Sequence, residues 1–453
     1  MSVPTDQQHM EKIVNLCKRR GFIFQASEIY GGLNGAWDYG PLGVELKRNL
    51  KNYWWRVTVH EREDVVGMDG AILTHPDVLK ASGHVEGFSD PMIDCRSCKA
   101  HLRLDQLIDK KGVKQCPNCG SKDLTEARQF NLMFETHVGA AADESSIAYL
   151  RPETAQSIFV QFKNILEVSR KKLPFGIAQI GKAFRNEINP RNFTFRSREF
   201  EQMELEYFCR PEQGMELLEY WKEERLKFYD DIGISRSKLH VRNVPDEERA
   251  FYSKGTYDIE YDFPFGRQEL EGVAYRTDYD LSQHQKASGK SLEYFDDETK
   301  QRFIPHVVEP SAGVDRTILA LICDAYGEDQ APDDKGKMET RVVLRFHPRL
   351  APIKCGIFPL LKNNAQLVAK AKEVVALLRP HMHVFYDESG AIGRRYRRQD
   401  EIGTPFGITV DFETLGEKDP TLRDTVTLRD RDSMKQRRIA IGALVSTLRA
   451  EII

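Results

Sequence analysis

Long apolar runs are missing from this chain of 453 residues, and so are internal repeats and low-complexity segments. A helix that crosses a membrane needs about 18–20 consecutive apolar residues, and no run approaches that length. The N-terminal residues MSVPTDQQHMEKIVNL are polar and do not resemble a signal peptide. We therefore expect a cytoplasmic protein with no membrane partner.

A surplus of charge is also missing, because 66 Lys and Arg residues nearly balance 69 Asp and Glu residues and leave a net charge of −3. That sum argues neither for nor against a nucleic-acid partner, so the distribution of charge matters more. From Arg341 to the end of the chain, 20 basic residues outnumber 13 acidic ones. Within this basic quarter, the loop expected at Gly393–Phe406 mixes arginines with aromatic residues, a pattern typical of a nucleic-acid surface.

The length of the chain and a change in composition indicate more than one domain. Single hydrophobic cores stop growing at about 250–300 residues, so this chain has room for two or three. The polar segment 327–340 is rich in Asp, Gly, Lys and Pro, which predicts a linker. Beyond it, short strand and helix patterns alternate, which predicts a small α/β domain. We place the two domains at 1–335 and 341–453.

Four of the eight cysteines form two Cys-x-x-Cys pairs within the segment 84–130, whose composition differs from its surroundings. These four residues are Cys95, Cys98, Cys116 and Cys119. Two such pairs at this separation are typical of a zinc ribbon, and a disulfide is the weaker alternative in a cytoplasmic protein. Four thiolate ligands leave no open position on the metal, so a structural Zn²⁺ is expected rather than a catalytic one.

The stretch around which the rest is organised runs from Gly181 to Phe208. Segments 176–187 and 200–208 alternate with a period of two and flank a loop rich in Asn, Pro, Arg and Phe, which predicts a long hairpin. Because strand side chains alternate between faces, Arg185 and Glu187 are expected to share one face. The return strand is expected to carry a polar face of alternate residues: Phe200, Gln202, Glu204 and Glu206. The residues alone leave open whether this face meets a ligand or only water.

The hairpin resembles the second signature motif of class II aminoacyl-tRNA synthetases, in which Arg-x-Glu and a loop precede Arg196-x-x-x-Phe200-x-x-x-Glu204. The other two motifs of that family occur in the expected order. Tyr39-Gly-Pro-Leu-Gly43 starts a predicted helix and resembles the first motif, while Glu309–Arg316 runs from a strand into a helix and resembles the third. The resemblance covers nearly the whole chain.

The resemblance implies an α/β (α+β) fold. Its parts would be a class II catalytic domain built on an antiparallel sheet with flanking helices, a zinc-ribbon-like insertion at 84–130, and a small C-terminal α/β anticodon-binding domain. It also implies a homodimer, in which the helix that begins at Pro41 packs on the two-fold axis. An apolar face with Tyr53 and Trp54 would suit such a contact.

Three further runs narrow the resemblance to the glycyl type, namely R-P-E-T-A-Q at 151–156, E-L-E-G-V-A-Y-R at 269–276 and E-P-S-A-G at 309–313. The implied partners are glycine, ATP and tRNA(Gly), with Mg²⁺ accompanying ATP. Activation of an amino acid brings its carboxylate to the α-phosphate of ATP, and these two anions repel each other until cations neutralise them. Arginine suits that task because its planar fork binds phosphate and carboxylate through two hydrogen bonds.

For ATP, the resemblance implies that Arg185 binds the α-phosphate and Arg316 the γ-phosphate. Glu187 and the adjacent loop would hold the adenine, and Phe200 would stack on it. Arg185, Arg316 and Glu187 are the residues expected to be catalytic. Glu269 and Glu309 would help position ATP through Mg²⁺. The expected ATP-binding set is Arg185, Asn186, Glu187, Phe195, Arg196, Phe200, Glu269, Leu270, Glu309, Ser311 and Arg316.

Glycine has no side chain, so a site can hold only its ammonium and its carboxylate. The resemblance implies that Glu153, Glu204 and Glu309 surround the ammonium, that Arg196 binds the carboxylate, and that Ser311 lies beside the Cα. The expected glycine-binding set is Arg103, Glu153, Arg196, Phe200, Gln202, Glu204, Glu309 and Ser311. Steric exclusion can reject every larger amino acid, so no editing domain is expected.

Two alternatives remain. A prolyl-, threonyl- or seryl-type synthetase would share the three motifs but would need a roomier site or a zinc ion at the substrate. A catalytically inactive homologue that binds nucleic acid as an accessory subunit would be expected to have lost Arg185, Glu187 or Arg316, and all three are present.

Overall fold

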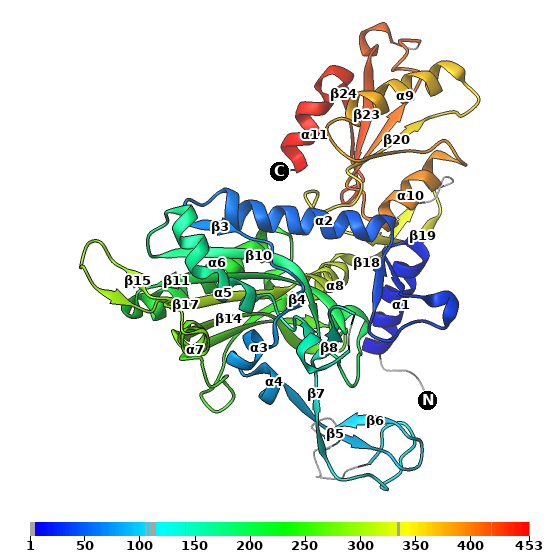
Figure 1. Ribbon diagram of the computed structural model, residues 1–453. Coiled ribbons are helices and arrows are strands. Elements are labelled where there is room, and N and C mark those ends of the chain that lie inside the picture. Colours follow the sequence, from blue (N-terminus) through cyan, green and yellow to red (C-terminus); the bar gives the residue numbers. More distant parts are fainter. Residues whose placement is uncertain are drawn as a thin grey trace.

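A seven-stranded sheet forms the centre of the molecule in the computed structural model, which describes residues 5–104, 107, 115–140, 142–332, 336–417 and 419–452. Its strand order is β12-β13-β14-β17-β11-β10-β3, and every neighbouring pair is antiparallel except β10 with β3. The strands are β3 (Val65–Gly67), β10 (Phe175–Phe184), β11 (Glu199–Cys209), β12 (Leu239–Asn243), β13 (Gly255–Phe263), β14 (Gly266–Thr277) and β17 (His306–Gly313). The expected antiparallel catalytic sheet with flanking helices is thus confirmed (Figure 1).

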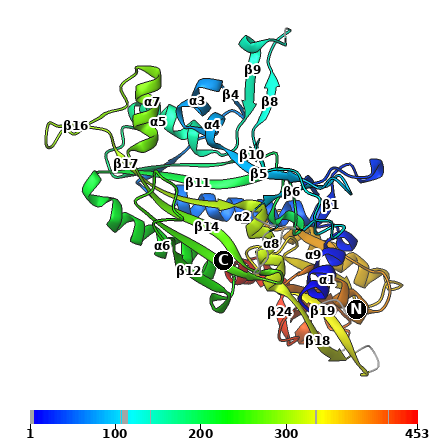
Figure 2. The same ribbon diagram turned by 90° about the horizontal axis from the view of Figure 1, so that it is seen from below.

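Helices cover both faces of this sheet (Figure 2). On one face lie α2 (Pro41–Trp55), α6 (Gly214–Asp231) and α8 (Val314–Ala325). On the other lie α5 (Ala155–Ser169) and α7 (Tyr279–Ser288). The alternation expected along β11 is confirmed, because Met203, Leu205 and Tyr207 enter the core on the first face. The polar residues between them therefore point toward α5 and α7.

The expectation that Arg185 and Glu187 share one face of a strand is wrong. Strand β10 ends at Phe184, and both residues belong to the loop that follows. The Glu187 amide donates to the carbonyl of Arg185 at 2.6 Å, a tight local turn that is incompatible with an extended strand. The loop carries these side chains toward the site individually, and no shared strand face does so.

Asp315 joins the three segments that resembled class II motifs. Its buried carboxylate accepts hydrogen bonds from the hydroxyl of Tyr39 at 2.6 Å, the ammonium of Lys47 at 2.9 Å and the backbone amide of Glu201 at 2.7 Å. These partners come from β2 (Trp37–Tyr39), α2 and β11, while Asp315 itself begins α8. The bonds hold the pKa of Asp315 below its usual range although burial alone would raise it.

Tyr53 and Trp54 do not form an exposed apolar face. Both lie in the core of their own chain, at 7% and 2% exposure, and Tyr53 stacks on Phe228 with ring centroids 6.0 Å apart. The expectation that these two side chains contact a second copy is therefore wrong. The helix does begin at Pro41 as expected, since proline suits the first position of a helix.

Shorter elements surround the central sheet. They are α1 (Thr5–Arg20), β1 (Ile23–Gln25), α3 (Pro76–Ala81), α4 (His84–Gly87), β15 (Tyr294–Phe295), β16 (Arg302–Phe303), and a three-stranded sheet of β4 (Leu73–Thr74), β9 (Ile147–Leu150) and β8 (Phe134–His137). A separate sheet of β6 (His101–Arg103), β5 (Ser89–Asp94) and β7 (Arg128–Asn131) carries the cysteine-containing insertion, which projects from the lower end in Figure 1. In the part of the chain that the structure describes, no helix has the length and apolar character to cross a membrane.

The expected linker at 327–340 is instead largely a hairpin. Strands β18 (Tyr326–Pro332) and β19 (Met338–Leu344) pair antiparallel from Tyr326↔Leu344 to Pro332↔Met338, and residues 333–335 lie outside the described residues. Its polar composition reflects exposed strands, which composition alone did not distinguish from a flexible segment. Beyond it, a five-stranded sheet of order β21-β20-β22-β23-β24 confirms the small α/β unit.

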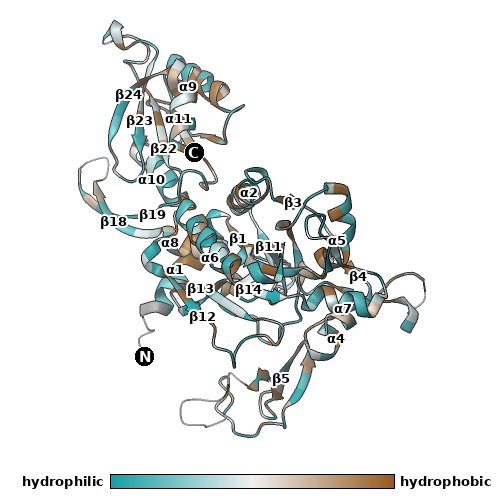
Figure 3. Cartoon of the chain, turned by 90° about the vertical axis from the view of Figure 1, so that its left-hand side faces the viewer, coloured by the Kyte–Doolittle hydropathy of each residue, from teal (hydrophilic) through white to brown (hydrophobic). Residues whose placement is uncertain are grey.

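This C-terminal unit contains β20 (Cys355–Pro359), α9 (Ala365–Leu378), β21 (Val384–Tyr386), α10 (Ile392–Ile402), β22 (Phe406–Val410), β23 (Thr425–Asp430), β24 (Gln436–Ala440) and α11 (Leu444–Ile452). The loop expected at 393–406 is wrong over most of its length, because α10 occupies it. Arg395 is 2% exposed and donates to the carbonyls of Pro359 and Gly390, and Arg398 pairs with Asp387. Although α10 is mostly hydrophilic (Figure 3), these arginines hold their own domain together.

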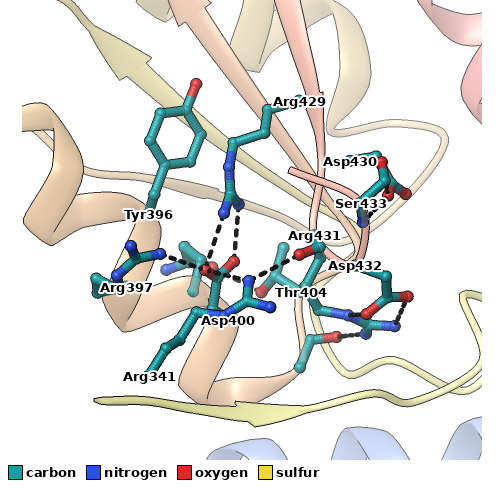
Figure 4. A network of polar contacts seen from close by, with 12 residues as sticks. Arg341, Tyr396, Arg397, Asp400, Thr404, Arg429, Asp430, Arg431, Asp432 and Ser433 are labelled. Atoms are coloured by element: carbon teal, nitrogen blue, oxygen red, sulfur yellow. Dashed lines mark hydrogen bonds and ion pairs between the residues drawn. The ribbon is translucent and has the colours of Figure 1, made fainter. Parts of the chain in front are cut away.

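Asp400 is the centre of the contact between the hairpin and the C-terminal unit (Figure 4). Its carboxylate is 1% exposed and pairs with Arg341 of β19 at 3.1 Å, Arg429 of β23 at 2.8 Å and Arg397 of α10 at 3.3 Å. Arg341 also donates to the carbonyl of Arg431 at 2.9 Å. One buried carboxylate therefore ties three elements to each other.

We predict that Asp400→Ala loosens this junction. Removing one partner of a buried ion pair typically costs about 3–5 kcal/mol because the remaining charge stays buried and uncompensated. Faster amide hydrogen exchange in β19 and α10, with β10 and β11 unchanged, is the expected result. Asp432→Ala is the matched control, since Asp432 pairs with Arg431 but is 48% exposed and should cost under about 1 kcal/mol. Equal exchange in both variants would contradict the prediction.

Candidate functional site

A cavity of about 430 Å³ opens on the face of the sheet between β11, β14 and β17. It is lined by eleven of the residues that sequence analysis selected: Arg103, Arg185, Glu187, Phe195, Arg196, Phe200, Gln202, Glu269, Glu309, Ser311 and Arg316. They come from sequence positions more than 200 residues apart, and the fold brings them to one place. Arg103 reaches the cavity from β6 of the insertion, where its guanidinium pairs with Asp90.

Four other selected residues touch the cavity less directly or not at all. Glu153 lines a neighbouring cavity together with His84 and Arg276. Leu270 is 1% exposed in the core behind the sheet, so only its backbone can face a ligand. Asn186 uses its backbone amide to donate to the carbonyl of Leu132 at 2.8 Å. Glu204 is 2% exposed and lies beneath the floor of the cavity, where Ser311 covers it.

Arg185 and Arg316 make one end of the cavity cationic. The Arg185 guanidinium lies 5.3 Å from the ring of Phe88 and 5.4 Å from that of Phe200, and its Nε donates to the carbonyl of Pro152. The Arg316 guanidinium lies 4.6 Å from the ring of Phe195. Contact with aromatic rings keeps these planar cations oriented while leaving N–H groups for an anion.

Two acidic residues accompany these arginines. Glu187 accepts a hydrogen bond from Arg196 at 3.2 Å, and Glu269 accepts one from Arg316 at 3.3 Å. The side chain of Glu269 is 51% exposed, so it faces the open part of the cavity. Burial lowers the pKa of Arg316, but arginine starts so high that it stays charged at neutral pH.

The other end of the site is built from one row of residues across four neighbouring strands. The register places Gln179 of β10, Glu204 of β11, Ser311 of β17 and Gly272 of β14 side by side. Ser311 Oγ donates to Glu204 Oε1 at 2.8 Å, and Thr154 Oγ1 donates to Glu204 Oε2. Gly272 adds no side chain, and a Cβ built there would meet nothing within 4 Å. The row thus leaves a small space beside Ser311.

Sequence reasoning missed Arg276, which lies behind this row. Its Nη1 donates to both carboxylate oxygens of Glu309, at 3.0 and 2.9 Å. Its Nε and Nη2 donate to the two oxygens of Asp280, at 2.8 and 2.9 Å. Arg276 is 4% exposed and fully engaged in this clamp. The signal was present, because Arg276 closes the E-L-E-G-V-A-Y-R run and lies four residues before Asp280.

His84 is a second missed residue. Its Nε2 lies 3.3 Å from Glu153 Oε2, and Gln156 donates to Glu153 Oε1 at 3.0 Å. Burial alone would raise the pKa of Glu153, but His84 and then Arg276 hold it well below its usual range. Glu153 is therefore a buried anion at neutral pH. No local pattern around His84 marks it, because only the fold brings it to Glu153.

Burial raises the pKa of Glu204 to about 8, and the charges of Glu309 and Glu153 add to the effect. Burial also raises the pKa of Glu309, although Arg276 opposes the shift. A group of carboxyl groups of which some are ionised and some are neutral is primed to receive a small cation. A cation that enters this group favours the ionised form of each carboxyl, so binding of the cation is coupled to release of protons.

The four cysteines of the insertion also come together. Their sulfur atoms all lie within 4.8 Å of one another, and the contacts Cys95–Cys119 and Cys98–Cys116 are 3.6 Å each. A tetrahedral Zn²⁺ with bonds of about 2.3 Å requires sulfur atoms roughly 3.8 Å apart. Hydrogen bonds from the backbone amides of Cys98 and Ser97 lower the pKa of Cys95 to about 6. The cluster is compatible with zinc.

We predict that Glu204→Gln stabilises the ligand-free protein increasingly as pH rises. A carboxyl whose folded pKa lies near 8, above its unfolded value near 4.5, costs no stability below pH 4.5 and costs progressively more up to pH 8. The glutamine carries no charge and escapes this cost. Melting temperatures of both proteins between pH 5 and 8.5 test it. The difference should widen with pH, and a constant difference would contradict the raised pKa.

Comparisons with known proteins agree with this geometry. A family model described as the class II core domain of tRNA synthetases (G, H, P, S and T) matches residues 134–325, and an anticodon-binding-domain model matches 354–451. The chain is 54% identical to glycine–tRNA ligase of Thermobifida fusca, over 95% of this chain and 96% of the relative. It is 52% identical to that of Treponema denticola, over 98% and 97%, and 50% identical to that of Clostridium tetani, over 99% of each.

Proposed function

Because the chain belongs to the glycine–tRNA ligase family, we propose that its central cavity is where glycine and ATP react. The enzyme is an aminoacyl-tRNA synthetase that attaches glycine to tRNA(Gly). A carboxylate oxygen of glycine attacks the α-phosphorus of ATP, and pyrophosphate leaves. A hydroxyl group at the 3′ end of the tRNA then attacks the glycyl carbonyl, and AMP leaves. Both steps need anions held close together.

The cationic end of the cavity is proposed to bind ATP. Arg185 would bind the α-phosphate, where charge develops as the new bond forms, and Arg316 the γ-phosphate. The guanidinium of Arg185 lies 5.4 Å from the ring of Phe200. The ring of Phe200 can therefore stack on a bound adenine while Arg185 contacts the phosphate group beside it. Glu187, fixed by Arg196, would accept hydrogen bonds from the adenine. What supports this division is that both arginines line the cavity. Among the described residues, Arg185 uses its Nε and Arg316 its Nε and Nη1 in hydrogen bonds, while Nη1 and Nη2 of Arg185 and Nη2 of Arg316 have no acceptor.

Mg²⁺ is the usual companion of ATP in class II synthetases. Glu269 fits such a role, because its carboxylate is half exposed at the phosphate end. Glu309, the other residue expected to position ATP through Mg²⁺, lies beside Arg276, Glu204 and Glu206 at the carboxylate-rich end. Because each carboxylate oxygen can accept more than one hydrogen bond, its contacts with Arg276 still allow it to accept from an ammonium, and we assign it to that end. A bound Mg²⁺ would neutralise phosphate charge beside Arg316.

The carboxylate-rich end is proposed to bind glycine. Glu153, Glu204 and Glu309 would surround the ammonium, with Ser311 and Gly272 beside the Cα. Any larger amino acid would have to place its side chain against Ser311 and the backbone of β14. Steric exclusion of this kind rejects every competitor of glycine, so one small site gives specificity without a second, hydrolytic site.

Arg196 was expected to bind the glycine carboxylate. Its guanidinium pairs with Glu187, which we propose for the adenine, so we place Arg196 at the ATP end of the cavity. Arg103 is the alternative cation, because it reaches the same cavity from the insertion. We propose that Arg103 binds the carboxylate of glycine.

The alternatives are disfavoured. Relatives of half or more identity are named glycine–tRNA ligases, and a prolyl-, threonyl- or seryl-type enzyme would need a roomier site or a zinc ion at the substrate. An inactive homologue would not need Arg185, Glu187 and Arg316 together in one cavity.

The C-terminal unit is proposed to bind the anticodon of the tRNA. The support is the match of 354–451 to the anticodon-binding model. Because most arginines of α10 are engaged in contacts within the chain, that helix is not the surface we propose. We also propose a cytoplasmic homodimer. Exposed apolar residues on the short 3-10 helix Glu28–Tyr30 support an interface, with Ile29 at 88% and Tyr30 at 87% exposure.

We expect Arg185→Ala to lower glycine-dependent ATP–pyrophosphate exchange by about 10²–10³-fold, the typical loss for one group that stabilises developing charge. Arg394→Ala is the matched control, because Arg394 is an exposed arginine in the C-terminal unit, which exchange does not require. Alanine, serine, proline and threonine should not support exchange with the wild-type enzyme. Near-normal exchange by Arg185→Ala would remove that residue from the phosphate role.

We further propose that the insertion carries one structural Zn²⁺ on Cys95, Cys98, Cys116 and Cys119. Among its described residues, the buried core of the insertion consists of Ile93, Leu102, Leu107 and two of the cysteines, too few to fold so short a segment alone.

Metal analysis of the purified protein should find about one zinc per chain. Cys116→Ser should reduce that content and speed hydrogen exchange in β5 and β7, because the segment loses its main source of stability. Cys355→Ser, a buried cysteine of the C-terminal sheet, is the control and should retain the metal. Full zinc content in Cys116→Ser would contradict the assignment.

A further inference from the structure

Glu206 is a buried acid that no motif and no role above accounts for. It follows Glu204 by two residues on β11 and therefore points to the same side of the sheet. The pairs Glu204↔Ser311 and Tyr207↔Val308 place it opposite Glu309 of β17, and Ile177 is its neighbour on β10. Its exposure is 0%, against 2% for Glu204 and 8% for Glu309. It thus lies below the three glutamates proposed to bind the glycine ammonium, Glu153, Glu204 and Glu309, which we call the ammonium cage.

Neither carboxylate oxygen of Glu206 has a hydrogen-bond donor among the described residues. The nearest cation is Arg276, whose donors are engaged with Glu309 and Asp280. Oxygen atoms of Glu204, Glu206 and Glu309 nevertheless lie within 4.8 Å of one another. Buried polar groups without partners are rare in native proteins, so this one requires an explanation.

The balance of charge gives that explanation. The carboxyl groups of Glu153, Glu204, Glu206, Glu309 and Asp280 are gathered around one arginine. A bound ammonium adds only one more positive charge. Carboxylates that share a buried site cannot all ionise, and the deepest and least solvated one is the first to keep its proton.

The groups around Glu206 all favour its neutral form except one. Burial raises its pKa well above the usual range, the charge of Glu309 adds to this, Arg276 opposes it, and Glu204 and Asp280 add again. These groups come from β11, β17, β14 and α7, while β10 contributes the apolar Ile177. Farther out lie Glu153 and His84.

We propose that Glu206 is a positioning residue for glycine, a neutral carboxylic acid whose hydroxyl is directed at Glu309 and which keeps its proton when the ammonium binds. This rests on the proposed function of the cavity. A hydrogen bond from Glu206 and the hydrogen bonds from Arg276 then fix the carboxylate of Glu309 together, which keeps the carboxylates of the ammonium cage close to one another. The proton released on glycine binding then comes from Glu204.

Two substitutions test whether Glu206 acts as a neutral carboxylic acid or as an ionised ligand of the ammonium. Glu206→Gln keeps a hydrogen-bond donor and adds no charge, so its KM for glycine should stay within about threefold of wild type. Glu206→Leu keeps the volume but has no donor. Its kcat/KM for glycine should fall about tenfold or more, the equivalent of one lost hydrogen bond, while its KM for ATP should hardly change.

Proton release provides a readout that a purely structural role would not move. Calorimetry of glycine binding at pH 7.5, in two buffers with different ionisation enthalpies, counts the protons released. Wild type and Glu206→Gln should release the same number, and Glu204→Gln almost none. The rise of kcat/KM with pH, with an apparent pKa near that of Glu204 at about 8, should persist in Glu206→Gln.

Glu271→Gln is the matched control, since Glu271 is another buried glutamate of the sheet but pairs with Arg225 away from the cage. It should leave proton release and the KM for glycine unchanged.

The proposal is overturned if Glu206→Gln loses proton release or raises the KM for glycine as much as Glu204→Gln, because Glu206 would then be an ionised ligand. It is equally overturned if Glu206→Leu matches wild type. Failure of the wild-type enzyme itself to bind glycine would instead refute the function proposed for the cavity. Should Glu206→Leu not fold, Glu206→Gln and proton counting still decide.

Discussion

A surplus of buried carboxyl groups around one arginine is the constraint on which this site depends. Arg276 pairs with both Glu309 and Asp280, and His84 pairs with Glu153. Glu204 instead accepts hydrogen bonds from the neutral side chains of Thr154, Ser311 and Gln202. Such an arrangement opposes folding, because charge is costly in a dry interior. A small cation with donors on three sides, such as the ammonium group of the proposed substrate, would offset this cost. The cost of burying these carboxyl groups and the proposed affinity for an ammonium group therefore have the same origin.

At the end of the cavity proposed to bind phosphate, a different set of contacts positions the side chains. Asp315 is fixed by Tyr39, Lys47 and the amide of Glu201, and Arg316 follows it directly in the chain. The position of the arginine proposed to bind the γ-phosphate thus depends on α2 and β11 together. Phe200 and Glu204 lie four residues apart on the same strand face, so the two proposed ends of the site share one rigid support. With this assignment, the backbone that positions ATP also positions glycine, and the reacting atoms would meet with little freedom left to lose.

The sequence predicted the main elements well where a periodic pattern extended over several residues. The face of β11, the helix after Pro41 and the C-terminal sheet are examples. It failed where tertiary contacts decide the outcome. Arginines beside aromatic residues at 393–406 indicated an RNA surface, but Arg395 and Arg398 bind carbonyl and carboxylate groups of their own domain. Composition cannot tell an arginine that faces solvent from one that caps buried carbonyls.

The same limit applies to the glutamates of the sheet. Glu271 and Glu206 are both buried on central strands, and each lies in an alternating run. Glu271 receives a hydrogen bond from Arg225 of α6 at 2.6 Å, so one of its oxygens has a cationic partner within the fold. Neither oxygen of Glu206 has a donor among the described residues, and most of its charged neighbours are acids. What distinguishes the two glutamates is therefore the tertiary partner that the fold brings to each, which the sequence pattern of a strand does not reveal.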